Sequence, residues 1–256
     1  MTAVALRPLS VGEILDASFQ VYRRHFGALA TIVLVCNGLP MLLQIYNSAS
    51  GGAHPILAVC AMLLGVILGL VATGASVFVV SESYLGRSIT AREALARATP
   101  FVVPMILVSV AVGLVAFLGF LLVVIPGLIA ICGLAVTIPA LVVESLNPTN
   151  AMGRSWNLTR GHRLRMLGLF IVIFILLVVP YLAVMGVFTA LGAIASAGGA
   201  KAVGAGLLLL GVVLAAVVQL LLSPLYQAAL VIAYYDLRVR KEGFDLEVLA
   251  SSLQAA

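Results

Sequence analysis

Charged side chains are scarce in this chain. Asp, Glu, Lys and Arg make up 9% of the 256 residues, whereas 63% of the residues are hydrophobic. A typical soluble domain carries charge on about a quarter of its residues. So few charges cannot cover a folded domain in water, and the composition therefore indicates a protein surrounded by lipid. Since no stretch has the composition of a soluble domain, we expect residues 1–256 to form a single membrane domain.

Cysteine is also scarce. Cys36, Cys60 and Cys132 all lie in apolar runs, and three widely separated cysteines match neither a zinc site nor a disulfide framework. We interpret them as small buried hydrophobic side chains. The sequence therefore predicts no metal and no cofactor.

Catalytic signatures are missing as well. The chain has no P-loop, no GxSxG, no HExxH and no dinucleotide-binding glycine motif. Its apolar runs contain no Asp, Glu, Lys, Arg or His well inside them, although proton relays and ion-coupled sites usually need such a residue. We therefore expect no catalytic residues, no enzymatic activity and no nucleic-acid partner, and an intramembrane enzyme is the weakest of the hypotheses.

Long apolar runs are what the sequence has instead. Six of them approach or exceed the roughly 20 residues that a transmembrane helix needs: 26–46, 55–80, 101–125, 127–143, 167–194 and 203–235. Pro126-Gly127 predicts a tight outer turn between the third and fourth spans. Pro224 predicts a kink, after which the last helix continues along or out of the interface; a seventh crossing is the alternative. We expect an all-α polytopic protein with a six-span bundle over residues 26–237.

The charges are distributed unequally between the two sides of this bundle. Of the 14 Lys and Arg residues, only Lys201 lies in a loop on the second side, and all nine acidic residues share the side of the other 13. The positive-inside rule predicts that this charged side, with both chain termini, faces the cytoplasm of a bacterial cell from its inner (plasma) membrane. The segment RSWNLTRGHRLRMLG, residues 154–168, is then part of the cytoplasmic surface.

Three segments on the charged side predict amphipathic helices in the interface: residues 1–25, about 89–99 and about 149–165. Ser10 with Glu13, and Thr90 with Glu93, have the spacing of a capping box, and Thr149 or Asn150 can cap the third helix. These segments suggest three repeats of an interfacial helix followed by a two-span hairpin, with residues 238–256 as a cytoplasmic tail. The alternative is that such helices form wherever a chain enters a bilayer.

One acidic residue lies where each even-numbered span ends: Glu82, Glu144 and Asp236. A carboxylate is unfavourable at the negative end of a helix dipole, so we hypothesise pairing with arginines of the interfacial helices; solvated acids are the alternative. The candidate residues for ion pairs or headgroup contacts are Glu82, Glu144, Asp236, Arg24, Arg154, Arg160, Arg163 and Trp156.

Two functional hypotheses remain open. The first is a non-enzymatic membrane scaffold whose basic face contacts anionic lipid headgroups, or a membrane or cytosolic protein partner. The second is a transporter or export component for an apolar or amphipathic substrate. Its path would be lined by Asn37, Gln44, Thr137, Gln219 and Gln227. Polar groups inside spans more often join helices, so a polar cavity reaching mid-membrane would favour transport and a dry bundle would favour the scaffold.

Three polar islands carry a resemblance to a known family: RPLSVGEILDASFQVYRRHFG, PALVVESLNPTNAMGRSWNLTRGHRLRMLG and YYDLRVRKEGFDLE. They resemble the bacterial membrane-domain family found fused to some glycerophosphoryl diester phosphodiesterases, and related stand-alone bacterial membrane proteins. The resemblance implies a multi-span inner-membrane protein. In the fused members the hydrolase is a separate soluble domain, so phosphodiesterase activity is not expected here.

Overall fold

The computed structural model describes residues 8–84 and 86–243, and these residues form helices and no β-strand. Six helical stretches are long and apolar enough to cross a membrane, so the structure confirms an all-α, polytopic membrane fold. The elements are α1 Val11–Arg24, α2 Phe26–Ala49, α3 Pro55–Tyr84, α4 Ala91–Ala98, the 3-10 helix η1 Thr99–Phe101, α5 Val102–Leu122, α6 Val124–Gly133, α7 Thr137–Val143, α8 Pro148–Thr159, α9 Arg163–Ala197 and α10 Lys201–Glu242.

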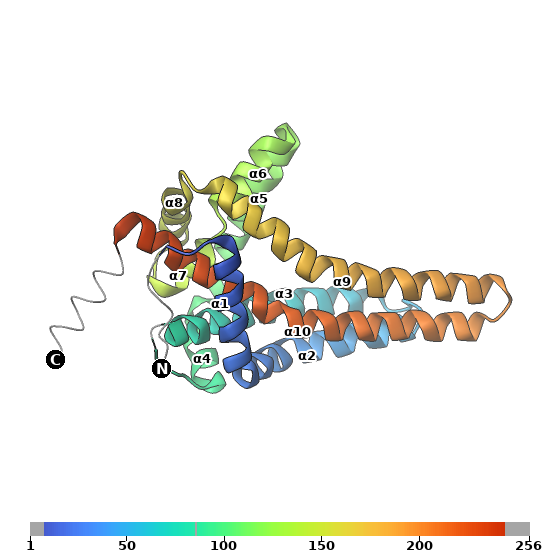
Figure 1. The fold of residues 1–256 in the computed structure, drawn as a ribbon. Helices are drawn as coiled ribbons and strands as arrows, with labels where there is room; N and C mark the ends of the chain where they lie inside the picture. The colour runs from blue at the N-terminus through green and yellow to red at the C-terminus, as the bar shows by residue number, and fades with distance from the viewer. Residues whose placement is uncertain (1–7, 85, 244–256) are drawn as a thin grey trace.

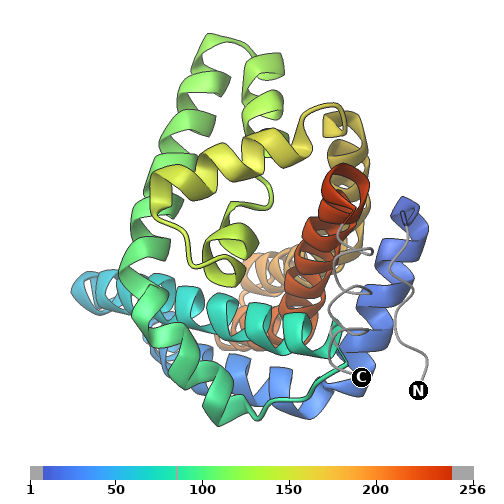
Figure 2. The same cartoon turned by 90° about the vertical axis from the view of Figure 1, so that its left-hand side faces the viewer.

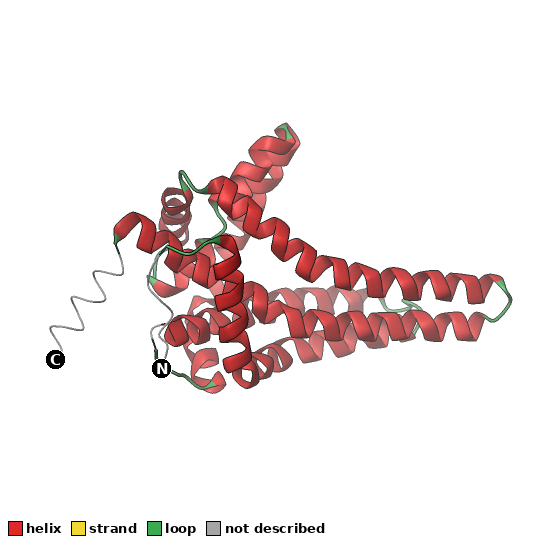
Figure 3. Cartoon of the chain, viewed as in Figure 1, coloured by secondary structure: helices red, strands yellow, loops and turns green. Residues whose placement is uncertain are grey.

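The long helices pair into hairpins, as Figure 1 shows. Helices α2 and α3 form one hairpin and α9 and α10 another; these two run in the same direction, and α10 packs against both α2 and α3. A third hairpin, α5 with α6, projects away from them (Figures 1 and 2). Figure 3 shows that the connecting loops are short. We call the end with α1, α4 and α8 the charged end, and the end with the α2–α3 and α9–α10 turns the far end.

The short helices α1 and α4 begin as the sequence predicts. Ser10 and Glu13 form a complete capping box at α1, and Thr90 and Glu93 form one at α4, which satisfies backbone donors that a helix start leaves free. The expected cap of the third helix is wrong. Asn147 is the N-cap of α8, no side chain caps it, and Pro148 takes the first helical position, where the missing proline N–H costs nothing.

The fourth span was predicted to be one helix that follows a tight turn at Pro126-Gly127. The structure differs from this prediction in two ways. The turn is Val123, and Pro126-Gly127 lie inside the first turn of α6, where proline is tolerated because its N–H would have no partner. Gly127 is required there, because an added Cβ would lie 2.5 Å from the Phe120 ring. The span then breaks between α6 and α7 at residues 134–136.

Pro224 does not end the last span. Helix α10 runs through Pro224 and is 42 residues long in all, which corresponds to about 63 Å at the α-helical rise. The sequence predicted that the part after Pro224 would lie along or out of the interface, and in the structure most of its residues up to Val239 are buried against other helices. They pack against α1, α3, α7 and α8 and form the centre of the core at the charged end.

The far half of the α9–α10 hairpin is held by glycine contacts. A Cβ on Gly204 would collide with the Ser196 hydroxyl and lie 2.6 Å from the Gly192 carbonyl oxygen, and one on Gly211 would lie 2.5 Å from Phe188 Cβ. Small residues let two membrane helices approach closely and gain van der Waals contact. Many apolar side chains on the outside of the hairpins are exposed, which is the arrangement expected of a surface in contact with lipid.

Candidate functional site: a polar cavity between three helices

A cavity of about 430 Å³ lies between α2, α3 and α10. Its volume is within the range of roughly 300–1,000 Å³ that is usual for small-molecule sites. Apolar and small side chains make up much of the wall, and polar residues from all three helices interrupt it. The polar residues are Asn37, Gln44, Thr73, Ser76, Gln219, Ser223 and Gln227.

Helix periodicity explains how these residues come to face one cavity. On α10, Gln219, Ser223 and Gln227 are four residues apart, which places them on one face. On α3, Thr73 and Ser76 are three residues apart on the face that carries Gly69. Asn37 of α2 faces Gly69, with 3.8 Å from the Asn37 amide oxygen to a Cβ built on Gly69, which is an ordinary van der Waals distance.

Hydrogen bonds tie α3 to α10 beside the cavity. The Gln227 Nε2 amide donates to Thr73 Oγ1 at 2.9 Å, and the Thr73 hydroxyl donates to the Gly69 carbonyl at 2.9 Å. The Asn37 amide donates within its own helix to the Val33 carbonyl at 3.2 Å. These bonds orient polar groups along the cavity wall while using only part of their hydrogen-bonding capacity.

Ser76 differs from the other serines and threonines of these helices. Its side chain is fully buried and lines the cavity, yet within the described part of the chain its hydroxyl has no hydrogen-bond partner. A buried serine in a helix ordinarily bonds to the carbonyl four residues earlier, as Ser18 does to Ile14 at 2.5 Å. Leaving a buried hydroxyl unpaired is costly, so the Ser76 hydroxyl is a group beside the cavity that a polar partner would stabilise.

The cavity is closed toward the charged end. Beyond Ser76 on α3, the Ser81 and Tyr235 hydroxyls are 2.5 Å apart, and the Tyr84 and Tyr235 rings stack with centroids 4.8 Å apart. All three side chains are buried.

Toward the far end the polar wall continues. Gln44 and Gln219 are exposed, and with Met41 and Ala216 they also line a second cavity of about 120 Å³ that extends past Ser48 and Tyr181. The polar surface thus reaches from the far end down to Ser76.

No charged residue lines either cavity, and within residues 8–84 and 86–243 no cluster of His, Cys, Asp or Glu is placed to hold a metal ion. Amide and hydroxyl groups can donate and accept hydrogen bonds with uncharged polar groups. They provide no counter-charge, so an ion in the cavity would lose its hydration without compensation. The arrangement suits a neutral, hydrogen-bonding ligand.

Four of the five residues predicted to line a transport path are brought together here: Asn37, Gln44, Gln219 and Gln227. The fifth, Thr137, is buried in α7 and donates to the Leu134 carbonyl at 2.7 Å. Thr73, Ser76 and Ser223 were not among the predicted lining residues, although the spacing of four between Ser223 and each of Gln219 and Gln227 is a signal that the sequence contains.

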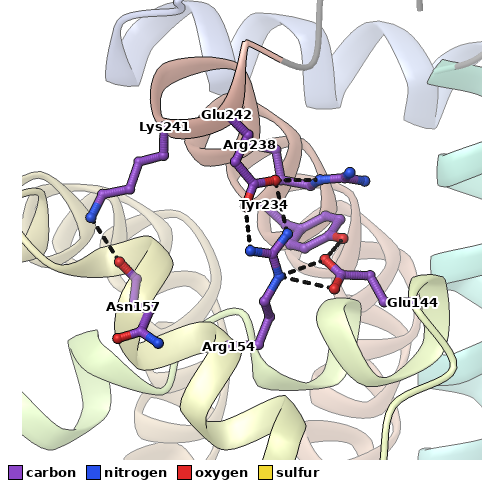
Figure 4. Close-up of polar contacts among 7 residues, drawn as sticks. All are labelled: Glu144, Arg154, Asn157, Tyr234, Arg238, Lys241 and Glu242. Atoms are coloured by element: carbon purple, nitrogen blue, oxygen red, sulfur yellow. Dashed lines mark hydrogen bonds and ion pairs between the residues drawn. The ribbon is translucent and has the colours of Figure 1, made fainter. Parts of the chain in front are cut away.

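The predicted charged residues lie elsewhere, at the charged end. Arg154 Nε donates to both Glu144 oxygens at 2.9 Å, and Arg154 Nη2 donates to Glu242 at 2.8 Å (Figure 4). The Tyr234 hydroxyl donates to Glu144 at 2.6 Å, and Arg238 Nε donates to Glu242 at 3.1 Å. The hydrogen bonds from Arg154 to Glu242 and Glu144 raise the pKa of its guanidinium above the ordinary value. This network ties α7 and α8 to the end of α10.

Asp236 has a different set of partners. Its buried carboxylate accepts the Leu9 amide N–H at 2.7 Å and pairs with Arg165 Nη2 and Arg240 Nε, each at 3.1 Å. It therefore joins the residue just before α1 to α9 and α10. Arg165 lies at the end of the predicted interfacial segment 149–165 but was not among the candidate arginines, and Arg240 lies on Asp236's own helix.

Glu82 pairs with Arg97 at 3.0 Å and with Arg87 at 3.8 Å. Among the arginines that the pairing hypothesis considered, Arg154 forms an ion pair with a span-end acid, Glu144. Arg24 and Arg160 are exposed and form no ion pair within the described residues. All three span-end acids have an arginine partner from the predicted interfacial segments 89–99 and 149–165: Arg97 for Glu82, Arg154 for Glu144 and Arg165 for Asp236.

Arg163 and Trp156 contact each other. The Arg163 guanidinium carbon lies 3.9 Å from the centre of the Trp156 ring, a cation–π geometry. The ring edge fills the space where Gly133 of α6 has no side chain, 2.5 Å from a Cβ built there. These two residues therefore fasten α8 to α6 and to the start of α9, while 37% of Trp156 remains exposed.

Comparisons with known proteins add no identity to this geometry: no family model, no curated protein and no solved structure matches the chain.

Proposed function

We propose that this protein binds, and carries across or within the membrane, an amphipathic molecule with an uncharged polar group. The observation that carries this proposal is the polar cavity between α2, α3 and α10, whose wall reaches from the far end to the unpartnered Ser76 hydroxyl. A dry bundle, which would have favoured the scaffold hypothesis, has no such cavity.

The lining suggests how the ligand would lie. At the closed end of the cavity its polar group would accept a hydrogen bond from Ser76 or from the Gln227 amide, and would donate one to Thr73, whose own hydroxyl proton is donated to the Gly69 carbonyl. Its apolar part would lie against Met41 and Met62, whose flexible thioether side chains adapt to differently shaped ligands. Hydroxyl or amide groups fit this role, because a charged headgroup would find no opposite charge there.

Transport requires that the closed end also open. The contacts that keep it shut are the Ser81–Tyr235 hydrogen bond and the stacking of Tyr84 on Tyr235, both between α3 and α10. Separation of these two helices at the charged end would expose the ligand to the opposite side, as alternating access demands.

The test is to identify what the protein carries. The protein is purified from native membranes, its bound molecules are extracted, and mass spectrometry measures their amounts per protein. Ala216→Phe fills the space shared by both cavities, whereas Val217→Phe, its neighbour on the exposed surface, leaves the cavity unchanged. We expect an uncharged amphipathic molecule enriched over bulk lipid in the wild type and in Val217→Phe, and lost in Ala216→Phe. Equal amounts in both variants, or only the bulk lipid composition in the wild type, would contradict the proposal.

A second role rests on the exposed arginines of the charged end. Arg23, Arg24, Arg92 and Arg160 are exposed and form no ion pair within the described residues. Each basic residue near an anionic membrane surface contributes about 1 kcal/mol of attraction. We assign this end to the cytoplasmic side of a bacterial inner membrane, where it would hold anionic lipid or a protein partner. Replacing the four residues with Gln should abolish any rise in melting temperature between zwitterionic and anionic nanodiscs; an unchanged rise would contradict the assignment.

The resemblance to the membrane-domain family remains a prediction, and it carries no catalytic role to any residue of this chain.

A further inference from the structure

The α5–α6 hairpin has an end unlike those of the other two hairpins. Val123 alone connects the two helices, and the residues around it are all apolar. Their exposed fractions are 71% for Leu121, 76% for Leu122, 57% for Val123, 60% for Val124 and 66% for Ile125. Five consecutive exposed aliphatic side chains form a surface that water does not tolerate well.

The ends of the long hairpins are polar by comparison. The α2–α3 turn carries Asn47, Ser50 and His54, and the α9–α10 turn carries Ser196 and Lys201. These residues suit turns that emerge into water on the far side of the membrane. The α5–α6 end has no group of this kind.

Part of the backbone of this turn is paired, which lowers the cost of placing it in hydrocarbon, while the Val124 and Ile125 N–H groups at the start of α6 have no backbone partner among the described residues. The Val123 N–H donates to the Gly119 carbonyl at 3.2 Å, and the Gly127 N–H donates to the Val123 carbonyl at 3.5 Å. Pro126 has no N–H to satisfy. Gly119 and Gly127 pack backbone to backbone, with 2.9 Å between the Gly127 Cα and a Cβ built on Gly119, so the hairpin closes tightly.

The direction of the hairpin gives a second, independent argument. In Figure 1, α5 and α6 point away from the common direction of the α2–α3 and α9–α10 hairpins. In Figure 2, which looks along those long hairpins from the charged end, α5 and α6 are seen lengthwise. If the long hairpins cross the bilayer, α5 lies across that direction, and its length does not carry its end to the far side.

We propose that α5–α6 is a re-entrant hairpin. It enters and leaves the membrane at the charged end, and its end from Leu121 to Ile125 lies among the acyl chains of the adjacent leaflet. The protein then has four complete crossings, α2, α3, α9 and α10, beside one hairpin that does not cross. The Trp156 contact with Gly133 fastens α8 of the charged end to α6 of this hairpin.

The test measures depth in the bilayer by spin labelling. In a chain with Cys36, Cys60 and Cys132 replaced by Ala, single cysteines are placed at Leu118, Val124 and, as the control in a polar turn, Ser50. The labelled full-length proteins are reconstituted in vesicles, and collision with oxygen is compared with collision with a water-soluble nickel chelate. All three positions are exposed or in a turn, so the labels should not disturb packing.

The proposal predicts that Val124→Cys, like Leu118→Cys, favours oxygen, while Ser50→Cys favours the nickel chelate. A crossing hairpin would instead give Val124→Cys the nickel accessibility of Ser50→Cys, and this result would overturn the proposal. Labelling of intact cells with an impermeant maleimide provides a second readout. Modification of Val124→Cys at the rate of Ser50→Cys would also overturn the proposal. Modification of Ser50→Cys while Val124→Cys stays unmodified would support it.

Discussion

At the residue scale, Asp236 is the acid whose loss should cost the most. It is 1% exposed and holds the Leu9 amide, Arg165 and Arg240 together. Asp236→Ala leaves the two arginines close to each other without a counter-charge, and breaking a buried pair costs about 3 kcal/mol or more. We expect a large fall in the melting temperature of the purified protein. Glu82→Ala is the control, because Arg97 and Arg87 are 52% and 73% exposed and a solvated pair contributes less than about 1 kcal/mol. Equal effects of the two changes would show that Asp236 is not the central anchor.

His162 should make the stability of the charged end depend on pH. Burial lowers the pKa of its imidazole, and the nearby Arg240, Lys241 and Arg165 lower it further, against a smaller opposite effect of Asp236. A histidine whose pKa is lower in the folded than in the unfolded state stabilises the fold above the unfolded pKa, about 6.5. That stability is lost as the pH falls from there toward the folded pKa.

We therefore expect the melting temperature to fall between pH 7.5 and pH 5.5, and to fall less in His162→Gln. The effect is partial, because burial and Arg24 lower the pKa of His25 in the same direction. His54→Gln, at the far end, is the control. A pH dependence identical in the wild type and His162→Gln would contradict this account.

Residue-level prediction from the sequence succeeded where geometry is local. The spacing of Ser10 and Glu13 determines a capping box within one helical turn. The partners of Asp236 could not be found in this way, because Leu9 and Arg165 reach it only through the packing of α1 and α9 against α10 at the charged end.

At the element scale, the α9–α10 hairpin depends on Gly204. A methyl group there would collide with Ser196 and lie against the Gly192 backbone, so Gly204→Ala must push the helices apart. Overpacking of this kind costs about 1–3 kcal/mol. Gly206→Ala, two residues away with open space around it, should be neutral or stabilising, because Ala favours helix over Gly by about 1 kcal/mol. Melting temperatures distinguish the two, and a tolerated Gly204→Ala would refute the close packing.

Apolar runs in the sequence were sufficient to predict which elements are helical, but not where some of them end. Pro126-Gly127 predicted a turn, yet the first turn of α6 accepts both residues and the turn lies at Val123. Pro224 predicted a kink with a helix continuing beyond it, and α10 does continue, with its second half surrounded by helices of the charged end.

At the scale of the whole molecule, the sequence was sufficient to predict a membrane protein with its charges gathered at one end. Most of the polar residues of the cavity could also be identified from the sequence, but only as individual residues within separate spans. Their convergence could not be predicted, because it depends on α10 packing against both α2 and α3. Once the three helices are together, Asn37, Thr73 and Gln227 face one space.

The central claim is that polar surface reaches from the far end to mid-membrane, and reaction of a cysteine at Thr73 tests it most directly. In the chain with its three native cysteines replaced by Ala, Thr73→Cys is treated with an uncharged, hydrophilic thiol reagent that does not cross the bilayer, applied from each side of sealed vesicles. Ile67→Cys, one and a half turns nearer the far end but exposed on the outside of α3, is the control. We predict that Thr73→Cys reacts from the far side several-fold faster than Ile67→Cys, because a thiol in hydrocarbon does not ionise. A Thr73→Cys as unreactive as Ile67→Cys would contradict the account.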